Sequence, residues 1–345
     1  MKALVLKEKM ELEIQEIPVP EIDPEEVLIK VEAVGICGSD VHGMDGSTGR
    51  RIPPIVMGHE ASGVIEAIGT KVSGWNVGDR VTFDSTIYEL GDWYTRQGLY
   101  NLSDHRRVLG VSCPDYKRNG AFAEYVNVPA HILYALPDNV SFEQAAMVEP
   151  VAVALHALSL TPIKTGDVAV VVGTGMIGLF IIQALHIAGC SKIVAIDKDT
   201  DRLNLAKEMG ASHIFQADHT NIPDEIRKLS HNRGADIAFE VVGISATLAL
   251  AVEVVRKGAV VTLVGNLAQK AEIPLQSVVT RQIRLQGSCA ICGEYPAALE
   301  LIASGKINID RMISAVVPLE EGAVWFDKLY RQEPGLMKVI LSNKK

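Results

Sequence analysis

Residues 168–178 read VAVVVGTGMIG, and this stretch decides the fold of the second half of the chain. A short apolar run that stops at a glycine is typical of a buried strand. Gly173, Gly175 and Gly178 then have the spacing that permits a tight turn, close approach of the backbone to a pyrophosphate and close helix–strand packing. The helix that follows begins at Met176 and Ile177, where free backbone amides can bind phosphate oxygens. The stretch predicts a dinucleotide-binding strand–turn–helix unit.

Strand and helix patterns alternate on the C-terminal side of this stretch, which predicts a doubly wound parallel sheet. The predicted strands are 168–172, 193–196, 213–215, 236–240 and 259–264, and the predicted helices are 176–189, 200–209, 221–230 and 245–255. Asp197 follows the second predicted strand, where a carboxylate accepts hydrogen bonds from the adenosine ribose and repels a 2′-phosphate. We therefore predict NAD rather than NADP, although Lys198 and Arg202 lie close enough in sequence to weaken that exclusion.

The first 150 residues have a different pattern. Short stretches rich in strand-forming residues, separated by glycine, proline and aspartate, occur at 26–34, 62–69, 78–83 and 121–126. Several short strands at close spacing predict a compact β-barrel-like domain. Near the C-terminus, a helix at 295–304 and an extended segment at 337–341 predict a return of the chain to this first domain.

Composition narrows the class of protein. A chain of 345 residues is too long for one ordinary core, so two domains are expected. With 48% hydrophobic and 22% charged residues, the chain has the composition of a soluble globular enzyme. A net charge of −9 without a basic cluster argues against a nucleic-acid partner. No apolar stretch reaches membrane-spanning length, so we expect no membrane partner.

Location is predicted from the N-terminus and the cysteines. The segment MKALVLKE at residues 1–8 becomes charged too early for a secretory signal. The five cysteines are an odd number and are widely dispersed, which fits a reducing cytoplasm better than a disulfide framework.

Residues that can bind a metal gather in three short segments. Residues 35–42 read GICGSDVH and residues 58–60 read GHE, which together offer a thiolate, an imidazole and a carboxylate. These are the ligand types of a catalytic zinc site, where one position stays open. Glu149 lies in the apolar run 145–158, where a charge is costly to desolvate without a strong partner such as a metal. Zinc and a dinucleotide in one chain predict hydride transfer to or from an alcohol or a carbonyl group.

Taken singly, each of these residues has an ordinary structural interpretation. Cys37 would be a small buried apolar residue, His59 a core histidine and Glu60 a surface acid. Their grouping, together with the buried Glu149, is what favours a metal site.

With these motifs the chain resembles the zinc-dependent medium-chain dehydrogenases, and within them the sorbitol (polyol) and butanediol dehydrogenase branch. The matching segments fall in the family order over nearly the whole chain: GICGSDVH (35–42), GHE (58–60), GDRV (78–81), GAFAEY (120–125), VEP (148–150) and GTGMIG (173–178). The resemblance implies an α/β protein with a GroES-like β-barrel catalytic domain over 1–150, a Rossmann NAD-binding domain over 151–286 and a return to the catalytic domain over 287–345. It also implies a homodimer or homotetramer, for which residues 271–285, read as β-rich, are the expected contact.

The resemblance also assigns roles to residues. It makes Cys37, His59 and Glu149 ligands of one catalytic zinc, with Glu60 as an adjacent carboxylate that exchanges with water as the fourth ligand. Ser39 then takes the proton of the substrate hydroxyl, which passes through the cofactor ribose to His42 and solvent. The implied cofactors are zinc and NAD, and the implied substrate is a small polyol or secondary alcohol.

One lobe departs from the family pattern. Most bacterial relatives hold a second, structural zinc there with four cysteines, and the corresponding residues in this chain are Glu89, Asp92, Thr95 and Ser103. Because no thiolate remains, a sulfur-ligated structural zinc is excluded and we predict one zinc per chain. Without this metal, the lobe is expected to be held in one of two ways. Either a neighbouring subunit holds it, or its aromatic residues pack it, namely Trp93, Tyr94 and Tyr100.

Several alternatives stay open. A lone C-x2-C pair at Cys289 and Cys292 has no second pair, and we assign it no metal or redox role.

Other activities also fit the motifs. One alternative is a threonine-dehydrogenase-like activity on an amino alcohol, which shares most of them. A sugar-alcohol phosphate dehydrogenase is a further alternative, in which Arg50 and Arg51 would bind the phosphate. A catalytically silent NAD-binding protein is disfavoured because the ligand set is retained.

Overall fold

A computed structural model describes residues 1–343 of the chain. It divides into two compact units, and unit 2, Pro150–Ala290, is inserted into unit 1, which consists of Met1–Glu149 and the chain from Ile291 onward. The resemblance places the return to the first domain at residue 287. Among the described residues, no helix combines the length and the apolar character needed to cross a membrane.

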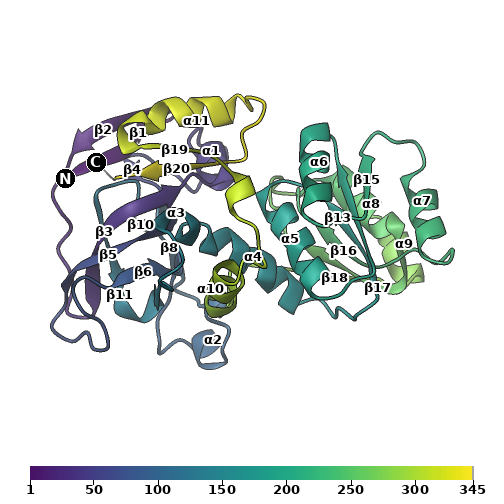
Figure 1. Cartoon of the computed structure of the whole chain (residues 1–345), viewed down its shortest axis with the longest axis horizontal. Helices are drawn as coiled ribbons and strands as arrows, with labels where there is room; N and C mark the ends of the chain where they lie inside the picture. Colours follow the sequence, from purple (N-terminus) through teal and green to yellow (C-terminus); the bar gives the residue numbers. More distant parts are fainter. Residues whose placement is uncertain (344–345) are drawn as a thin grey trace. The chain divides into compact units, whose positions relative to one another are not determined.

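Unit 2 is a doubly wound parallel sheet. Its strands are β13 (Val168–Val172), β14 (Lys192–Asp197), β15 (His213–Gln216), β16 (Ala235–Glu240), β17 (Val255–Leu263) and β18 (Arg284–Gly287). Its helices are α5 (Met176–Ile187), α6 (Thr200–Glu208), α7 (Ile222–Leu229), α8 (Ser245–Val254) and α9 (Leu275–Thr280), while α4 (Val148–Ser159) spans the boundary between the units. Figure 1 shows α5 and α6 on one face of the sheet and α7 to α9 on the other. Because both faces are covered, all five residues of β13 are buried, as the apolar run predicts.

The strand order of unit 2 positions its ligand site. The order is β15-β14-β13-β16-β17-β18, all parallel. Counted along the chain this is 3-2-1-4-5-6, in which the connections diverge next to the first strand. Dinucleotides bind outside the carboxyl ends of the strands at such a point. The turn after β13 is therefore where a cofactor is expected.

Unit 1 is mainly antiparallel. Its strands are β1 (Lys2–Glu8), β2 (Glu11–Glu16), β3 (Glu26–Gly35), β4 (Ile55–Val56), β5 (Glu60–Ile68), β6 (Arg80–Phe83), β7 (Thr86–Ile87), β8 (Arg107–Val108), β9 (Val111–Cys113), β10 (Tyr116–Arg118), β11 (Tyr125–Pro129), β12 (Leu133–Ala135), β19 (Ile313–Pro318) and β20 (Lys338–Ser342). Its helices are α1 (Gly38–Gly43), α2 (Trp93–Arg96), α3 (Phe142–Ala145), α10 (Tyr295–Ala303) and α11 (Gly322–Tyr330). The main sheet has seven strands, in the order β12-β6-β5-β3-β20-β19 with β11 also paired to β3.

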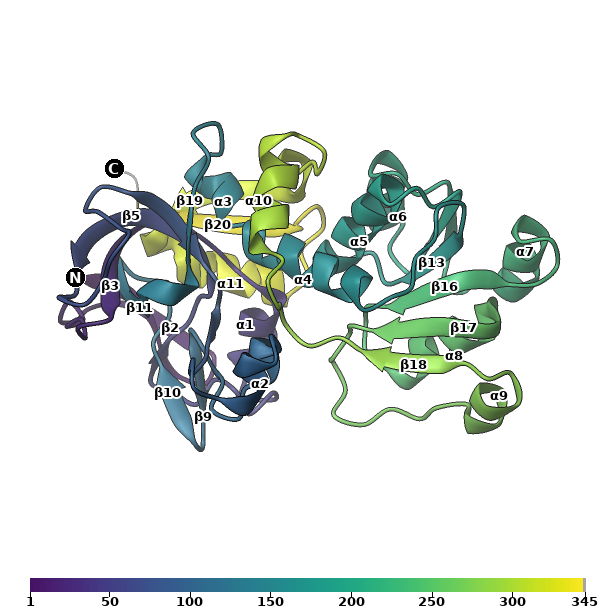
Figure 2. The ribbon, with the colours of Figure 1, turned by 90° about the horizontal axis from the view of Figure 1, so that it is seen from below.

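The C-terminal strands complete this sheet. β20 pairs antiparallel with β3, and β19 pairs parallel with β20. Figure 2 shows β19 and β20, in yellow, within the same unit as the purple and blue strands β3 and β5. The return of the chain therefore adds the last two strands to the main sheet of unit 1, and one of their residues, Lys338, reaches the metal-ligand candidates.

Two strand predictions were wrong in extent. Residues 121–126 were predicted as a strand, but β11 starts at Tyr125; the preceding residues instead form scattered backbone hydrogen bonds, such as Leu4 N to Phe122 O and Phe122 N to Met57 O. Residues 271–285 were read as β-rich, but they contain the helix α9, and β18 begins only at Arg284. β-branched residues such as Val278 and Val279 fit a strand by propensity, but that preference is weak, and neither residue lies in a strand.

Candidate metal centre and dinucleotide site

The metal-ligand candidates of the first half meet because of the strand register. Gly35 of β3 is opposite Glu60 of β5 and opposite Ile340 of β20. Cys37 lies just beyond β3 as the N-cap of α1, and His59 directly precedes Glu60, between β4 and β5. Pairing of β3 with β5 therefore brings together side chains that are more than twenty positions apart in the sequence.

Cys37, His59 and Glu60 form a compact group. Their candidate ligand atoms all lie within 4.8 Å of one another. His59 is 6% exposed and Glu60 is 1% exposed. In the part of the chain that the structure describes, this is the one group of three or more such side chains close enough to hold a metal ion. A thiolate, an imidazole and a carboxylate are a suitable set for zinc.

Two buried polar atoms beside this group support a metal there. Among residues 1–343, His59 Nδ1 and Asp40 Oδ2 have no hydrogen-bond partner, and they lie 3.6 Å apart. A metal-ligating histidine usually directs its second ring nitrogen at a carboxylate, which fixes the ring orientation. Asp40 is placed for that role, which leaves His59 Nε2 as the nitrogen for the metal.

Glu149 stands beside this group rather than in it. It lies in the first turn of α4, and its Oε1 accepts a hydrogen bond from Ser85 Oγ at 3.1 Å. Burial raises the pKa of Glu149 to about 7, although His59 acts in the opposite direction. Burial, and next the charge of Glu60, raises the pKa of the Cys37 thiol. The structure thus brings three of the four expected ligands together, because Glu60 is tied to His59 by the chain, whereas Glu149 comes from a separate helix with its own partner.

Lys338 is a charged residue at the site that sequence reasoning missed. Its Nζ lies 2.5 Å from Glu60 Oε2 and donates to the Ile36 carbonyl oxygen at 3.0 Å. The side chains are 3% and 2% exposed for Lys338 and Glu60. Burial acts to lower the pKa of Lys338, but the charges of Glu60 and Cys37 outweigh it and the pKa is raised. The available signal was a lysine that opens the otherwise apolar segment KVIL of a fully buried strand.

The two residues expected to move the proton lie on α1. Ser39 Oγ donates to Cys37 Sγ at 3.3 Å, so the hydroxyl is in direct contact with a ligand candidate. His42 lies in the last turn of the same helix. Both residues are exposed, which gives them access to solvent and to small molecules.

Arg51 does not have its expected role. It was interpreted as a phosphate ligand, but it is 4% exposed. Its Nε and Nη2 donate to Asp40 Oδ1 at 3.1 and 2.7 Å. The phosphate-binding interpretation of Arg51 is wrong because its guanidinium is already used to neutralise a fully buried carboxylate. Arg50, in contrast, is exposed.

The glycine-rich turn of unit 2 has the expected geometry. Gly173 has φ 100°, a conformation that L side chains rarely adopt. A Cβ on Gly178 would overlap the carbonyl oxygen of Gly173, so close packing of α5 on the turn requires glycine there. A Cβ on Gly175, the N-cap of α5, would meet nothing within 4 Å. That open space, next to the free amides of Met176 and Ile177, is suited to a pyrophosphate.

Asp197 holds this turn as well as ending β14. Its Oδ2 accepts from Thr174 N at 2.6 Å and from Thr174 Oγ1 at 3.0 Å, and its Oδ1 accepts from Asp199 N at 3.0 Å. The sequence indicated Asp197 but gave no sign of the link to Thr174. Arg202, on α6, lies with Nε 3.7 Å from Asp199 Oδ2, so its charge is partly compensated there.

In the lobe around residues 89–103, where cysteines are missing, the carboxylate of Asp92 accepts hydrogen bonds from several backbone amides. Asp92 Oδ1 accepts from Tyr94 N at 2.9 Å and Thr95 N at 3.2 Å, and its Oδ2 accepts from Asp104 N at 3.2 Å. Asp92 thus caps α2 and ties it to the other end of the lobe. These hydrogen bonds hold the lobe locally at one of the four positions that the resemblance assigns to the cysteines of a structural zinc.

Tyr100 anchors the lobe to the body of unit 1. Its ring stacks on Tyr88 with centroids 4.3 Å apart, and its hydroxyl donates to Asp84 Oδ2 at 2.7 Å while accepting from Gly293 N at 2.8 Å. Trp93 was expected to pack the lobe, but it is 64% exposed and only meets Tyr94 edge-on. The buried anchor is therefore a hydrogen-bonded tyrosine rather than a tryptophan core.

Asp84 makes this anchor sensitive to pH. The side chain is 1% exposed, and burial raises its pKa to about 6. Because the pKa is higher in the folded state than the usual 3.9, the folded state binds the proton more tightly. Stability from this group is therefore full below about pH 4 and is lost as the pH rises to about 6, by about 3 kcal/mol in all. We expect the unfolding free energy of wild type relative to Asp84→Asn to fall by that amount between pH 4 and 7, in chemical denaturation; a pH-independent difference would contradict this.

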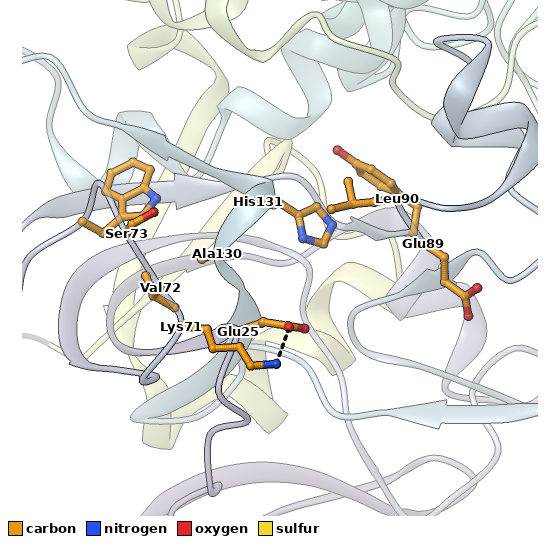
Figure 3. A pocket seen from close by; sticks show the side chains of 10 residues that line it. Glu25, Lys71, Val72, Ser73, Glu89, Leu90, Ala130 and His131 are labelled. Atoms are coloured by element: carbon orange, nitrogen blue, oxygen red, sulfur yellow. Dashed lines mark hydrogen bonds and ion pairs between the residues drawn. The ribbon is translucent and has the colours of Figure 1, made fainter.

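A hollow of about 630 Å³ in unit 1 is separate from the metal-ligand group. Figure 3 shows the Lys71–Glu25 ion pair on one side of it and the ring of His131 on another, and the pair has an N–O distance of 3.1 Å. Burial lowers the pKa of His131. None of the predicted site residues lines this hollow.

Comparisons with known proteins agree along the whole chain. Residues 23–138 match the family model described as alcohol dehydrogenase GroES-like domain, and residues 177–304 match the one described as zinc-binding dehydrogenase. The chain is 34% identical over 346 residues to a sorbitol dehydrogenase of Bacillus subtilis (strain 168), covering 99% of this chain and 97% of that protein. It is also 34% identical over 333 residues to a D-arabitol-phosphate dehydrogenase of Enterococcus avium, covering 95% and 93% of the two chains.

A solved structure gives the same result. A zinc-binding dehydrogenase from Sinorhizobium meliloti 1021, bound to NADP, superposes with a TM-score of 0.90 at 30% identity, over 99% of this chain and 98% of that one. The resemblance inferred from the motifs is confirmed, as is the combination of a GroES-like domain with a Rossmann sheet. Both family models and full-length relatives thus lead to one conclusion: the chain belongs to the zinc-dependent medium-chain dehydrogenases, in their polyol dehydrogenase branch, and is an oxidoreductase.

Proposed function

We propose that this enzyme transfers hydride between NAD and a polyol or another secondary alcohol, interconverting the alcohol and its ketone. The observation that carries the proposal is the Cys37–His59–Glu60 group, whose ligand atoms lie within 4.8 Å of one another. The names of the relatives, sorbitol dehydrogenase and D-arabitol-phosphate dehydrogenase, support the substrate class. Unit 1 acts as the catalytic domain in this proposal and unit 2 as the cofactor-binding domain.

In this proposal, some residues of unit 1 bind the metal and others transfer the substrate proton. Cys37, His59 and Glu60 would hold the zinc, and Glu149, on which the charges of His59 and Glu60 act, would be a further carboxylate at the site. Zinc, when bound, supplies Lewis acidity that favours loss of the proton from the substrate hydroxyl. Ser39, whose hydroxyl lies next to Cys37 Sγ on an exposed face, would accept that proton and give up its own hydroxyl hydrogen. His42, also exposed, would pass the released hydrogen on to solvent.

A substrate panel tests this function directly. Protein of known zinc content would be assayed with sorbitol, xylitol, 2,3-butanediol, D-arabitol phosphate and threonine, each with NAD and with NADP. We expect reduction of NAD with polyols or butanediol, and one tightly bound zinc per chain. Preference for the phosphorylated polyol would narrow the substrate, and preference for threonine would replace it with an amino alcohol. No zinc and no turnover with any alcohol would favour a silent NAD-binding protein.

Asp197 is proposed to select NAD. Replacing it by asparagine keeps the size of the side chain but removes the charge that disfavours a 2′-phosphate. Loss of charge-assisted hydrogen bonds to the ribose should lower kcat/KM for NAD by about 10–100-fold, while kcat/KM for NADP rises. Steady-state kinetics with both cofactors would show the change in ratio. Asp201→Asn, at an exposed acid in the first turn of α6, is the matched control. An unchanged ratio in Asp197→Asn would contradict the assignment.

We also propose that the enzyme is a cytoplasmic homo-oligomer, assembled through the β18 edge of the unit 2 sheet. β18 is the last strand of that sheet, and Leu275 and Val279 on the neighbouring helix are 61% and 68% exposed. Exposed apolar side chains beside an open strand edge support a contact between subunits. None of the five cysteines is in a disulfide within the described residues, in keeping with a reducing compartment. Light scattering coupled to size-exclusion chromatography would distinguish monomer, dimer and tetramer.

A further inference from the structure

We propose that Arg51 is a positioning residue for the reaction: one buried guanidinium sets the carboxylate that orients His59 and also holds the hydroxyl of Ser39. The inference rests on the proposed function, because it concerns the residues that hold the metal and accept the substrate proton. Arg51 itself is not placed to touch a substrate, since it is 4% exposed.

The contacts of Arg51 explain how Asp40 faces His59. Arg51 Nε and Nη2 both donate to Asp40 Oδ1, at 3.1 and 2.7 Å. The other carboxylate oxygen, Oδ2, is left 3.6 Å from His59 Nδ1. Because Arg51 occupies one oxygen, the second is reserved for the imidazole. Partners of this kind, one shell beyond the metal ligands, fix the tautomer and the ring orientation of a ligating histidine.

The same guanidinium reaches the proton acceptor. Arg51 Nη2 lies 3.3 Å from Ser39 Oγ and donates to it. A serine hydroxyl has one hydrogen and two acceptor lone pairs. With one lone pair bound by Arg51, the second lone pair can accept the substrate proton, while the serine's own hydrogen, directed at Cys37 Sγ 3.3 Å away in this structure, leaves for solvent by way of His42. An arginine does not lose its own proton in proteins, so it can orient Ser39 without competing for the transferred proton.

The surrounding chain is built to hold Arg51 in place. Its Nη1 donates to the carbonyl oxygen of Arg50 at 2.9 Å. The backbone on both sides is bound to β9, because Ile52 N donates to Ser112 O at 3.1 Å and Ser112 N donates to Arg50 O at 3.2 Å. A Cβ on Gly43 would lie 2.5 Å from Arg51 Cγ, so the glycine at the end of α1 leaves room for the arginine stem.

Two variants disturb this arrangement in different ways. Arg51→Lys keeps a positive charge beside Asp40, which limits the risk of misfolding, but cannot bind Asp40 and Ser39 with one planar group. Gly43→Ala keeps every charge and displaces the arginine stem. For both we expect zinc affinity, measured by competition with a chromophoric chelator, or kcat to fall by about 10–100-fold. KM for an unphosphorylated polyol should change little, because no substrate contact is lost. The exposed neighbour Arg50→Lys is the matched control and should behave as wild type.

A double-mutant cycle separates positioning from general stability. If Arg51 acts through Ser39, the loss of kcat caused by Arg51→Lys should be much smaller in a Ser39→Ala background than in wild type. Equal losses in both backgrounds, or wild-type zinc affinity and kcat in Arg51→Lys and Gly43→Ala, would overturn the proposal. If wild type turned over no alcohol, the zinc measurement would still test the contact with His59, so failure of the proposed function and failure of the Arg51 role are distinguishable.

Discussion

Cys37→Ala should leave a folded protein with almost no bound zinc and almost no dehydrogenase activity. Cys37 supplies the only sulfur of the Cys37–His59–Glu60 group, and its removal leaves nitrogen and oxygen ligands alone. Zinc bound by thiolate, imidazole and carboxylate contributes several kcal/mol of transition-state stabilisation, so the loss in kcat should be at least about 10³-fold. Metal analysis after gel filtration, together with turnover of the best polyol, measures both effects.

Cys190→Ala is the matched control for this substitution. Cys190 is a free, partly buried thiol of unit 2, and its removal should change neither zinc content nor kcat. Full zinc occupancy in Cys37→Ala would show that the metal is held elsewhere.

The two carboxylates can be ranked in the same assay. Glu60→Gln should weaken zinc binding more than Glu149→Gln, because Glu60 is part of the compact group and Glu149 is bound to Ser85. The reverse order would restore Glu149 as a direct ligand.

Lys338→Met should destabilise the zinc-free protein by about 3–5 kcal/mol, because it leaves a buried carboxylate without its partner. Lys338 and Glu60 are 3% and 2% exposed, so water cannot replace the lost ammonium group. In the zinc-loaded protein the metal offers Glu60 a second cation, and the loss should be smaller. Chemical denaturation of both forms measures the difference.

Two further variants make this result interpretable. Lys338→Met combined with Glu60→Gln should recover part of the stability, since the unpaired charge is then removed. Lys71→Met breaks an exposed ion pair with Glu25, whose side chains are 66% and 74% exposed, and should change stability little. If Lys338→Met lowered the unfolding free energy of the zinc-free protein as little as Lys71→Met does, the buried Lys338–Glu60 pair would not be important for stability.

Local sequence patterns predicted correctly those elements in which a single physical requirement, such as burial of a strand or binding of a phosphate, restricts the residue type at every position. The apolar run 168–172 with its three glycines predicted β13, the turn and α5, because a buried strand and a phosphate-binding turn restrict every position. Strand–helix alternation predicted the parallel sheet of unit 2. Residues 271–285 were misread, because strand propensity is a weak signal and α9 has no buried residue whose spacing could have marked it as a helix.

The sequence by itself determined the family, the two kinds of domain and the ligand types of the metal site, since each of these is written in contiguous motifs such as GICGSDVH, GHE and GTGMIG. Only the tertiary structure decided which charges lie together. Lys338 meets Glu60 because β20 pairs with β3, and Arg51 meets Asp40 and Ser39 because its side chain packs into the space beside Gly43. The residues next to these charged side chains in the sequence do not show whether they are buried. Their burial is fixed by pairing between distant segments, and burial in turn sets the strength of their electrostatic interactions.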